Sequence, residues 1–392
     1  MLKITLAALG IYLSTLAGFS QATPDSSLYK NRKLKFEEAN FVSSYYHQEG
    51  NNSAVTGGIG TEKLTDFATT IDVKFSRYDY QKRKHTLTGE LGVDVYSSAS
   101  SDKIDPNTIS SASSGDVRVY PSLTWAMTDE QKGSTLSVNG SFSGEYDYYS
   151  VGGSLGWTKL SKDRNREVGV KAQVFFDTWS VIYPIELRSP SNPDREPRNS
   201  YSTSFTLSQV ITKRLQMLLI ADVAYQEGLL GTLYHRTYFT DGSHKVENLP
   251  GTRFKVPIGI RANYFMGDRF IFRTFYRYYQ DSWELSAHTA ELETTVKITP
   301  FFSVSPFYRY YTQKGVKYFA GYEQHDLAEE FYTSDYDLST LTSTMLGLGL
   351  RYAPPGGLMG ITKLNAAEIR YGHYDRSTGL NSNIISLMLK LK

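Results

Sequence analysis

The sequence has no cysteine among its 392 residues. That absence excludes disulfide frameworks, thiolate metal sites, thiol nucleophiles and an acylated lipoprotein cysteine. A strong charge of one sign is also missing, since 42 Lys and Arg residues face 40 Asp and Glu residues and leave a formal net charge of +2. Nucleic-acid binders usually carry a strong basic patch, so this balance argues against a nucleic-acid partner.

Long apolar runs are absent after the N-terminus. Residues 4–19 form one short apolar run behind Lys3, and the small-residue pattern Ser20-Gln21-Ala22 precedes Thr23. This arrangement predicts a secretory signal peptide over residues 1–22, followed by a periplasmic N-terminal segment over residues 23–35. No later segment reaches the roughly 18–20 continuous apolar residues that a spanning helix needs. The exported chain is therefore expected to be either soluble or a membrane β-barrel.

Aromatic residues are abundant instead. The chain has 30 Tyr, 20 Phe and 4 Trp, yet its mean hydropathy of −0.37 is that of a water-soluble protein. Period-two alternation reconciles these properties, because a strand with one apolar and one polar face is polar on average. In the segment 67–75, for example, Phe67, Ile71 and Val73 alternate with Asp72 and Lys74.

The alternation recurs along the whole chain and predicts about sixteen strands. They are expected near residues 36–47, 65–78, 85–97, 115–127, 134–146, 149–159, 167–177, 201–212, 215–226, 253–266, 269–280, 284–298, 301–312, 339–352, 362–375 and 382–391. Each is long enough to cross a bilayer at a tilt, and short connections alternate with long ones, as in bacterial outer-membrane barrels. Residues 36–392 are therefore predicted to form an all-β fold, a transmembrane antiparallel up-and-down β-barrel with short periplasmic turns and long external loops. Its expected location is the cell outer membrane, with aromatic belts at both lipid interfaces.

The polar face of each strand would line the barrel lumen. Early strands place small polar residues there, whereas later strands place charged residues: Arg261, Arg273, Arg277, Arg309, Arg351 and Arg370, with Glu291, Glu293 and Glu368. Arginines that line a pore can select anions, so these nine residues are the candidate lumen-lining and selectivity residues. The alternative is a network of Arg–Glu pairs between neighbouring strands that neutralises itself. The leading hypothesis is a passive pore or channel for small polar solutes, and no cofactor is implied.

No catalytic constellation is evident. Gly152, Ser154 and Gly156 match the nucleophile-elbow pattern of hydrolases, but no helix follows the serine, as that chemistry requires. The seven histidines show no metal-ligand spacing such as HExxH, and the acidic segment 323–337 lacks the spacing of a calcium loop. We therefore expect neither enzyme activity nor a metal, and we interpret segment 323–337 as a solvated external loop.

The long external loops support a second hypothesis. Loops 178–200, 227–252 and 314–338 contain many aromatic residues, which favour contact with a protein partner. The alternative function is therefore a loop-occluded structural or partner-binding barrel, the membrane component of a larger exported redox or secretion complex. In either case the barrel would contact outer-membrane lipid and the outer-membrane assembly machinery. The loop Ser98–Ser114 is either a recognition or constriction loop or an ordinary solvated one.

Two segments resemble a known bacterial family. Residues 96–106 read Tyr-Ser-Ser-Ala-Ser-Ser-Asp-Lys-Ile-Asp-Pro, with Ile-Ser-Ser-Ala-Ser-Ser at 109–114 and Asp116-x-Arg118 after them, and residues 177–188 read Asp-Thr-Trp-Ser-Val-Ile-Tyr-Pro-Ile-Glu-Leu-Arg. They resemble the domain-of-unknown-function family numbered thirty-five seventy, uncharacterised outer-membrane β-barrel-like proteins, over essentially the whole mature chain. The resemblance implies such a barrel, with no established activity and no catalytic residues. The last strand departs from the commonest outer-membrane ending because it lacks a terminal aromatic residue.

Overall fold

The computed structural model describes residues 33–97 and 115–392. The predicted signal peptide over residues 1–22, nearly all of the predicted segment 23–35 and the Ser98–Ser114 loop lie outside the described residues. Within the described ranges, no helix is long and apolar enough to cross a membrane.

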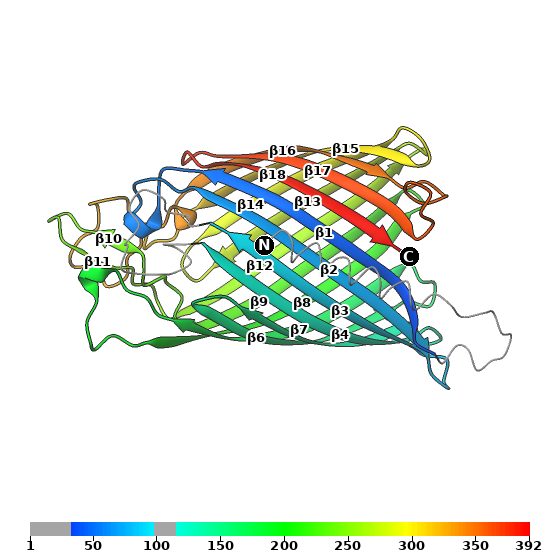
Figure 1. Ribbon diagram of the computed structural model, residues 1–392, viewed down its shortest axis with the longest axis horizontal. Coiled ribbons are helices and arrows are strands. Elements are labelled where there is room, and N and C mark those ends of the chain that lie inside the picture. Colours follow the sequence, from blue (N-terminus) through cyan, green and yellow to red (C-terminus); the bar gives the residue numbers. More distant parts are fainter. Residues whose placement is uncertain (1–32, 98–114) are drawn as a thin grey trace.

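Sixteen strands pair antiparallel and close on themselves into one barrel (Figure 1). They are β1 (Lys35–Glu49), β2 (Leu64–Tyr78), β3 (Lys84–Tyr96), β4 (Asp116–Asp129), β5 (Ser134–Gly144), β6 (Tyr148–Leu160), β7 (Arg166–Ser180), β8 (Arg195–Thr212), β9 (Leu215–Gly228), β12 (Thr252–Met266), β13 (Phe270–Asp281), β14 (Ser286–Lys297), β15 (Phe302–Lys314), β16 (Leu341–Tyr352), β17 (Leu364–Arg376) and β18 (Asn381–Leu391). The barrel closes where β1 pairs with β18, with Ala39 opposite Leu391 at one end and Glu49 opposite Asn381 at the other. This confirms the predicted fold class.

The largest difference from the predicted strands lies between β7 and β8. The loop expected over residues 178–200 is wrong at both ends, because β7 continues to Ser180 and β8 already begins at Arg195. One of the four prolines in this segment, Pro197, does not prevent pairing, since it lies opposite Thr178 in the ladder. An ion pair between Arg198 and Asp177, with 3.0 Å between Nε and Oδ2, fastens the two strands just beyond it.

The outer face of the barrel is apolar. Large hydrophobic side chains at alternate strand positions lie open to the surroundings, with exposed fractions of 49% for Phe67, 60% for Leu155 and 63% for Leu346. A contiguous apolar surface of this extent on a closed barrel is what a lipid environment requires. Exposed aromatic residues lie toward one end of their strands at Tyr45 and Tyr225 and toward the other end at Trp157, Tyr264, Phe270, Phe301 and Tyr352, whereas the exposed Tyr276, Tyr308 and Tyr371 lie near the middle of theirs.

The inner face can be assigned from a contact between strands that are not neighbours. Arg370 on β17 donates a hydrogen bond of 2.5 Å to Glu293 on β14, although β15 and β16 lie between these strands. Side chains separated by two strands can meet only on the concave side of a curved sheet. Because side chains alternate between the two faces, this contact fixes the inward set on every strand through the pairing register.

The loops at one end form a packed cap beyond the barrel rim, opposite the end where the C-terminus lies (Figure 1). We define the cap as residues 50–63, 181–194, 229–251, 282–285 and 315–340. It contains the hairpin of β10 (Arg236–Tyr238) and β11 (His244–Val246) and three short 3-10 helices, η2 (Ala54–Thr56), η3 (Ile185–Leu187) and η4 (Tyr336–Leu338). Phe239, His325 and Thr333 are fully buried within it. The interpretation of segment 323–337 as a solvated loop is therefore wrong for His325 and Thr333.

Candidate functional site

The nine charged residues predicted to line the lumen all occupy inward positions on β12 to β17. Glu293 is shared by two arginines, since it accepts hydrogen bonds from Arg273 and from Arg370, both at 2.5 Å. Arg370 also donates to Glu368 at 3.1 Å. Glu368 in turn lies 3.9 Å from Arg351, so four strands are joined by one chain of charges.

Two glycines on β16 make this chain of charges sterically feasible. A Cβ added at Gly347 would come within 2.1 Å of the Phe307 ring, and one at Gly349 would touch the Arg370 side chain at 3.4 Å. Both positions face the lumen. The absence of side chains on this strand lets Arg370 cross it toward Glu293 and lie 4.8 Å from the centre of the Phe307 ring.

The remaining arginines fall into two classes. Arg309 forms its own pair with Glu291, with 2.8 Å between Nη2 and Oε2. Arg261 and Arg277 have no carboxylate within 4.0 Å among the residues described. Arg261 instead lies over the Phe275 ring, 5.4 Å from its centre. Four of the six arginines thus belong to the predicted Arg–Glu network, and two add cationic charge that the network does not cancel.

Acidic residues line the opposite wall, which the sequence interpretation described as mainly small and polar. Asp72 on β2 and Asp94 on β3 occupy inward positions, where they accept hydrogen bonds from Asn40 at 3.0 Å and from the Tyr120 hydroxyl at 2.9 Å. Glu90 on β3 is exposed within the same inward set. In the strand order, β3 is eight strands from β13, so these carboxylates face the arginines across the lumen.

The signal for this acidic wall was present in the sequence. Asp72 shares its strand face with Thr70, and Glu90 shares its face with Thr88, so the alternation that identified the threonines as inward also identifies the acids. Two cations lie on the same strands: Arg118 on β4 lies opposite Asp94 and stacks on the Tyr120 ring at 5.1 Å, and Lys74 on β2 pairs with Glu37 and Glu38. The two walls therefore carry charge of opposite sign, with the acidic wall partly compensated.

Open space remains along both walls. A cavity of about 450 Å³ lies against β3 to β8, with Glu90, Arg118 and Asp177 in its lining. Another of about 360 Å³ lies against β13 to β17 and contains the Arg273, Glu293 and Arg370 side chains. Since both are lined by charged side chains on the inward face, the lumen has room for water and small polar molecules beside these charges.

The cap is fastened to the inner face of β13 to β17. Gln313, an inward residue of β15, donates hydrogen bonds to the backbone carbonyls of Asp337 at 2.9 Å and Ser339 at 2.5 Å. Trp283 and Val316 belong to a buried cluster in the cap, and the inward Tyr279 and Tyr311 pack against this cluster. The cap therefore covers this side of the mouth instead of standing away from the barrel.

The cap loops are also joined to each other. Arg236 donates to the carbonyl oxygen of Val55 at 2.9 Å and forms an ion pair with Glu186, so it connects three separate loops. Hydrogen bonding to Arg236 lowers the pKa of Glu186 against a smaller effect of burial. The sequence offered no signal for these contacts, because they join loops that have no periodic pattern.

The serine of the apparent nucleophile motif lies in a regular strand. Ser154 is an inward residue of β6, opposite Asn139 on β5 and Gln173 on β7. The strand-turn-helix that exposes a hydrolase nucleophile is not formed around it. Its position is that of a lumen-lining residue.

The chain is similar to one protein family in sequence and to several solved structures in fold. The model of a family described as "Protein of unknown function (DUF3570)" matches residues 105–377. No curated protein matches the chain.

Among solved structures, the chain is similar to OpdK of Pseudomonas aeruginosa, whose structure was solved with vanillate. The sequence identity is 9%, the alignment covers 90% of this chain and 97% of that chain, and the TM-score is 0.42. For OccD3 (OpdP) of the same organism the identity is 8%, the coverage is 91% of each chain and the TM-score is 0.44. A structure titled "Bacterial polysaccharide outer membrane secretin" gives 11% identity, coverage of 90% of this chain and 98% of that one, and a TM-score of 0.45.

Proposed function

The chain belongs to this family of proteins of unknown function, and we propose that it is an outer-membrane β-barrel that acts as a passive pore for small polar solutes. The observation that carries the proposal is the closed sixteen-strand sheet with an apolar outer face and a hollow, charged inner face. Barrels of this strand number are wide enough to pass water unless loops fill them. The proposal implies contact with outer-membrane lipid and, during insertion, with the outer-membrane assembly machinery.

The charges on the two walls support a preference among solutes. Arg261, Arg273, Arg277, Arg309, Arg351 and Arg370 outnumber Glu291, Glu293 and Glu368 on one wall, while Asp72, Glu90 and Asp94 lie across the lumen from them. Such a transverse field attracts anions to one wall and orients molecules that carry both charges. We infer that the pore favours small anions or zwitterions over cations of the same size.

The position of the cap indicates that the entrance to the proposed pore is narrow. Segment 315–340 docks on the inner face of the barrel through Gln313 and the Trp283 cluster, so it reduces the open area of the mouth. A narrowed mouth favours passage of small molecules and excludes large ones. The expected substrates are therefore small as well as polar.

Conductance of the purified mature chain in a planar bilayer tests the proposal. Discrete conductance steps are expected, and they should become larger when residues 318–335 are replaced by a short Gly-Ser linker. A matched control makes the same type of replacement in the turn 354–360 at the other end of the barrel, which should leave the step size unchanged. Absence of steps from both the complete chain and the chain with the shortened cap would refute a pore.

The alternative, a partner-binding barrel, stays a second proposal. It was motivated by aromatic residues in the external loops, but Tyr234, Phe239 and Tyr332 are buried inside the cap, with exposed fractions of 4%, 0% and 8%. Burial removes them from any surface that a partner could contact. Affinity capture from membranes would favour this alternative only if it returned one partner in a stoichiometric amount.

A further inference from the structure

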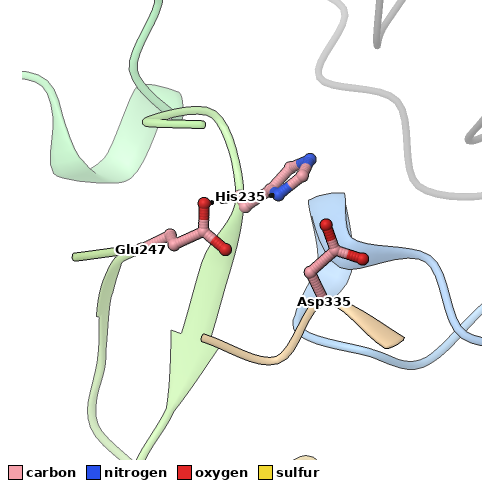
Figure 2. A group of neighbouring side chains, drawn as sticks. All are labelled: His235, Glu247 and Asp335. Carbon is pink, nitrogen blue, oxygen red and sulfur yellow. Dashed lines mark ion pairs between the residues drawn. The ribbon is translucent and has the colours of Figure 1, made fainter. Parts of the chain in front are cut away.

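Three side chains with metal-binding atoms meet inside the cap. His235 precedes β10, Glu247 follows β11, and Asp335 lies just before η4. One nitrogen or oxygen atom from each lies within 4.8 Å of the others, and His235 Nδ1 is 3.8 Å from Glu247 Oε2. Figure 2 shows the two carboxylates approaching the imidazole from different sides.

The donor atoms of this group are available and oriented. His235 Nδ1 is buried and has no hydrogen-bond partner within the described part of the chain. Glu247 is held in place because one oxygen accepts from the backbone N–H of Thr232 at 2.6 Å and the other from the Thr333 hydroxyl. Asp335 Oδ1 accepts from the backbone N–H of Asp337 at 2.9 Å, which leaves Oδ2 for a ligand. Hydrogen bonds of this kind orient the ligands of known metal sites.

The surroundings contain more negative than positive charge. Glu62 and Asp337 interact with the group, and the Arg376 guanidinium is shared between these two carboxylates, with 4.0 Å to Glu62 and a direct ion pair to Asp337. Burial and the charge of Asp337 raise the pKa of Glu62 to about 7. A cation of higher charge at the group would relieve this repulsion.

We propose that His235, Glu247 and Asp335 bind one divalent transition-metal ion, of which Zn²⁺ is the suitable probe. One imidazole nitrogen and two carboxylate oxygens are a donor set that suits Zn²⁺ and its neighbours, whereas Ca²⁺ takes six or more oxygens. Tetrahedral Zn²⁺ with bonds of about 2.1 Å places its donors about 3.4 Å apart, so His235 and Glu247 need to approach each other only slightly.

The site has access and an open coordination position. His235 also lines a cavity of about 320 Å³ between the cap and the barrel rim, together with Tyr96, Trp179 and Thr232. Water or a small ligand in this cavity can occupy the fourth position of a metal bound by three protein ligands. The bound ion would also join two segments of the cap, 229–251 and 315–340, that are distant in sequence. This inference goes beyond the proposed pore and does not depend on it.

Zn²⁺ binding to the complete mature chain in detergent, purified without a polyhistidine tag and stripped with EDTA, tests the site directly. One Zn²⁺ per chain is expected in equilibrium dialysis. His235→Gln and Asp335→Asn should each lower the affinity at least tenfold, because each removes one of three ligands. The matched control His244→Gln, in the same hairpin but pairing with Glu186, should bind as the wild type does.

A second measurement uses the unmodified chain, because a variant that loses the cap structure would lose Zn²⁺ affinity whether or not the replaced residue is a ligand. With Cu²⁺ as probe, electron paramagnetic resonance should show coupling to a single imidazole nitrogen, and Zn²⁺ should abolish the signal by competition, whereas Ca²⁺ at the same concentration should not. Heat-modifiable gel migration verifies that every variant retains its barrel. Binding of less than one Zn²⁺ in five chains, affinity that is unchanged in His235→Gln, or a Cu²⁺ signal without nitrogen coupling would each overturn the proposal.

Discussion

On the proposed pore function, replacing Arg261 by Gln should weaken the preference for anions. Arg261 lies on the inner face of β12 and has no carboxylate within 4.0 Å among the described residues, so its charge acts on the lumen without local cancellation. The substitution removes one positive charge and retains much of the side-chain volume. It leaves the Arg–Glu network of the neighbouring strands in place.

The size of the effect follows from Coulomb's law. A unit charge about 7 Å from a passing ion in water contributes about 0.6 kcal/mol, and salt at 0.1 M reduces this to about 0.3 kcal/mol. An anion loses this attraction in the variant while a cation is relieved of the same repulsion. The anion-to-cation permeability ratio should therefore fall about threefold, because the two effects multiply.

Reversal potentials in a tenfold KCl gradient measure this ratio. The matched control is the double substitution Arg309→Gln with Glu291→Gln, which removes an ion pair and leaves the net charge of the wall unchanged. It should shift the reversal potential little. The reasoning is refuted if the control changes selectivity as much as Arg261→Gln does, or if Arg261→Gln leaves the ratio unaltered at 0.1 M salt.

Three further predictions concern the stability of the cap and the wall. Asp281→Ala should destabilise the cap by about 3–5 kcal/mol, because it removes a buried carboxylate and leaves the largely buried Arg253 guanidinium without its partner. Limited proteolysis of the cap measures this, and cleavage at the wild-type rate would contradict it. Gly347→Leu should lower the yield of the heat-modifiable folded band severalfold, since the added Cβ would come within 2.1 Å of the Phe307 ring. Gly140→Leu is the control and should fold normally, because no atom lies within 4 Å of a Cβ added there. The folded pKa of Glu62, about 7, lies above its ordinary value of 4.5, so the stability contributed by its protonated form is fully present below pH 4.5 and is lost as the pH rises through 7. Glu62→Gln should therefore remove this pH dependence of cap proteolysis, and an unchanged pH profile would count against the raised pKa.

The barrel could be predicted from the sequence because its signal is local. Every strand needs an apolar outer face and a polar inner face, so the pattern repeats in each segment without reference to its neighbours. Boundaries shifted where a strand continued past prolines, as at Pro197, because pairing with Thr178 depends on a partner strand. The inward set of arginines followed from the same alternation. Their pairing did not, since the contact of Arg370 with Glu293 joins residues 77 positions apart.

The cap could not be predicted because its order comes from contacts between loops. Arg236 and Val55 are 181 positions apart, and Asn248 meets Tyr332 through an isolated bridge. No periodic pattern in the sequence predicts such contacts. An aromatic residue in a loop is equally compatible with contact to a partner protein and with burial in a core. His235, Glu247 and Asp335 were missed for the same reason, since their spacing matches no known metal motif and only the folded loops bring them together.

The position of the cap determines which of the two charged walls a solute would meet first. The cap is fastened over β13 to β17, on the cationic side, through Gln313 and the Trp283 cluster. A cavity at this end lies on the other side, lined by Leu64 of β2, Tyr96 of β3 and Trp179 of β7. A solute entering there meets aromatic rings and the acidic wall before it reaches the arginines. A zwitterion would therefore enter with its cationic group toward β3 and its anionic group toward β13, whereas a simple anion would have to pass the acidic wall first. On this reasoning small zwitterions should permeate faster than anions of equal size, and a liposome-swelling comparison of the two classes distinguishes a transverse field from a uniformly cationic lumen.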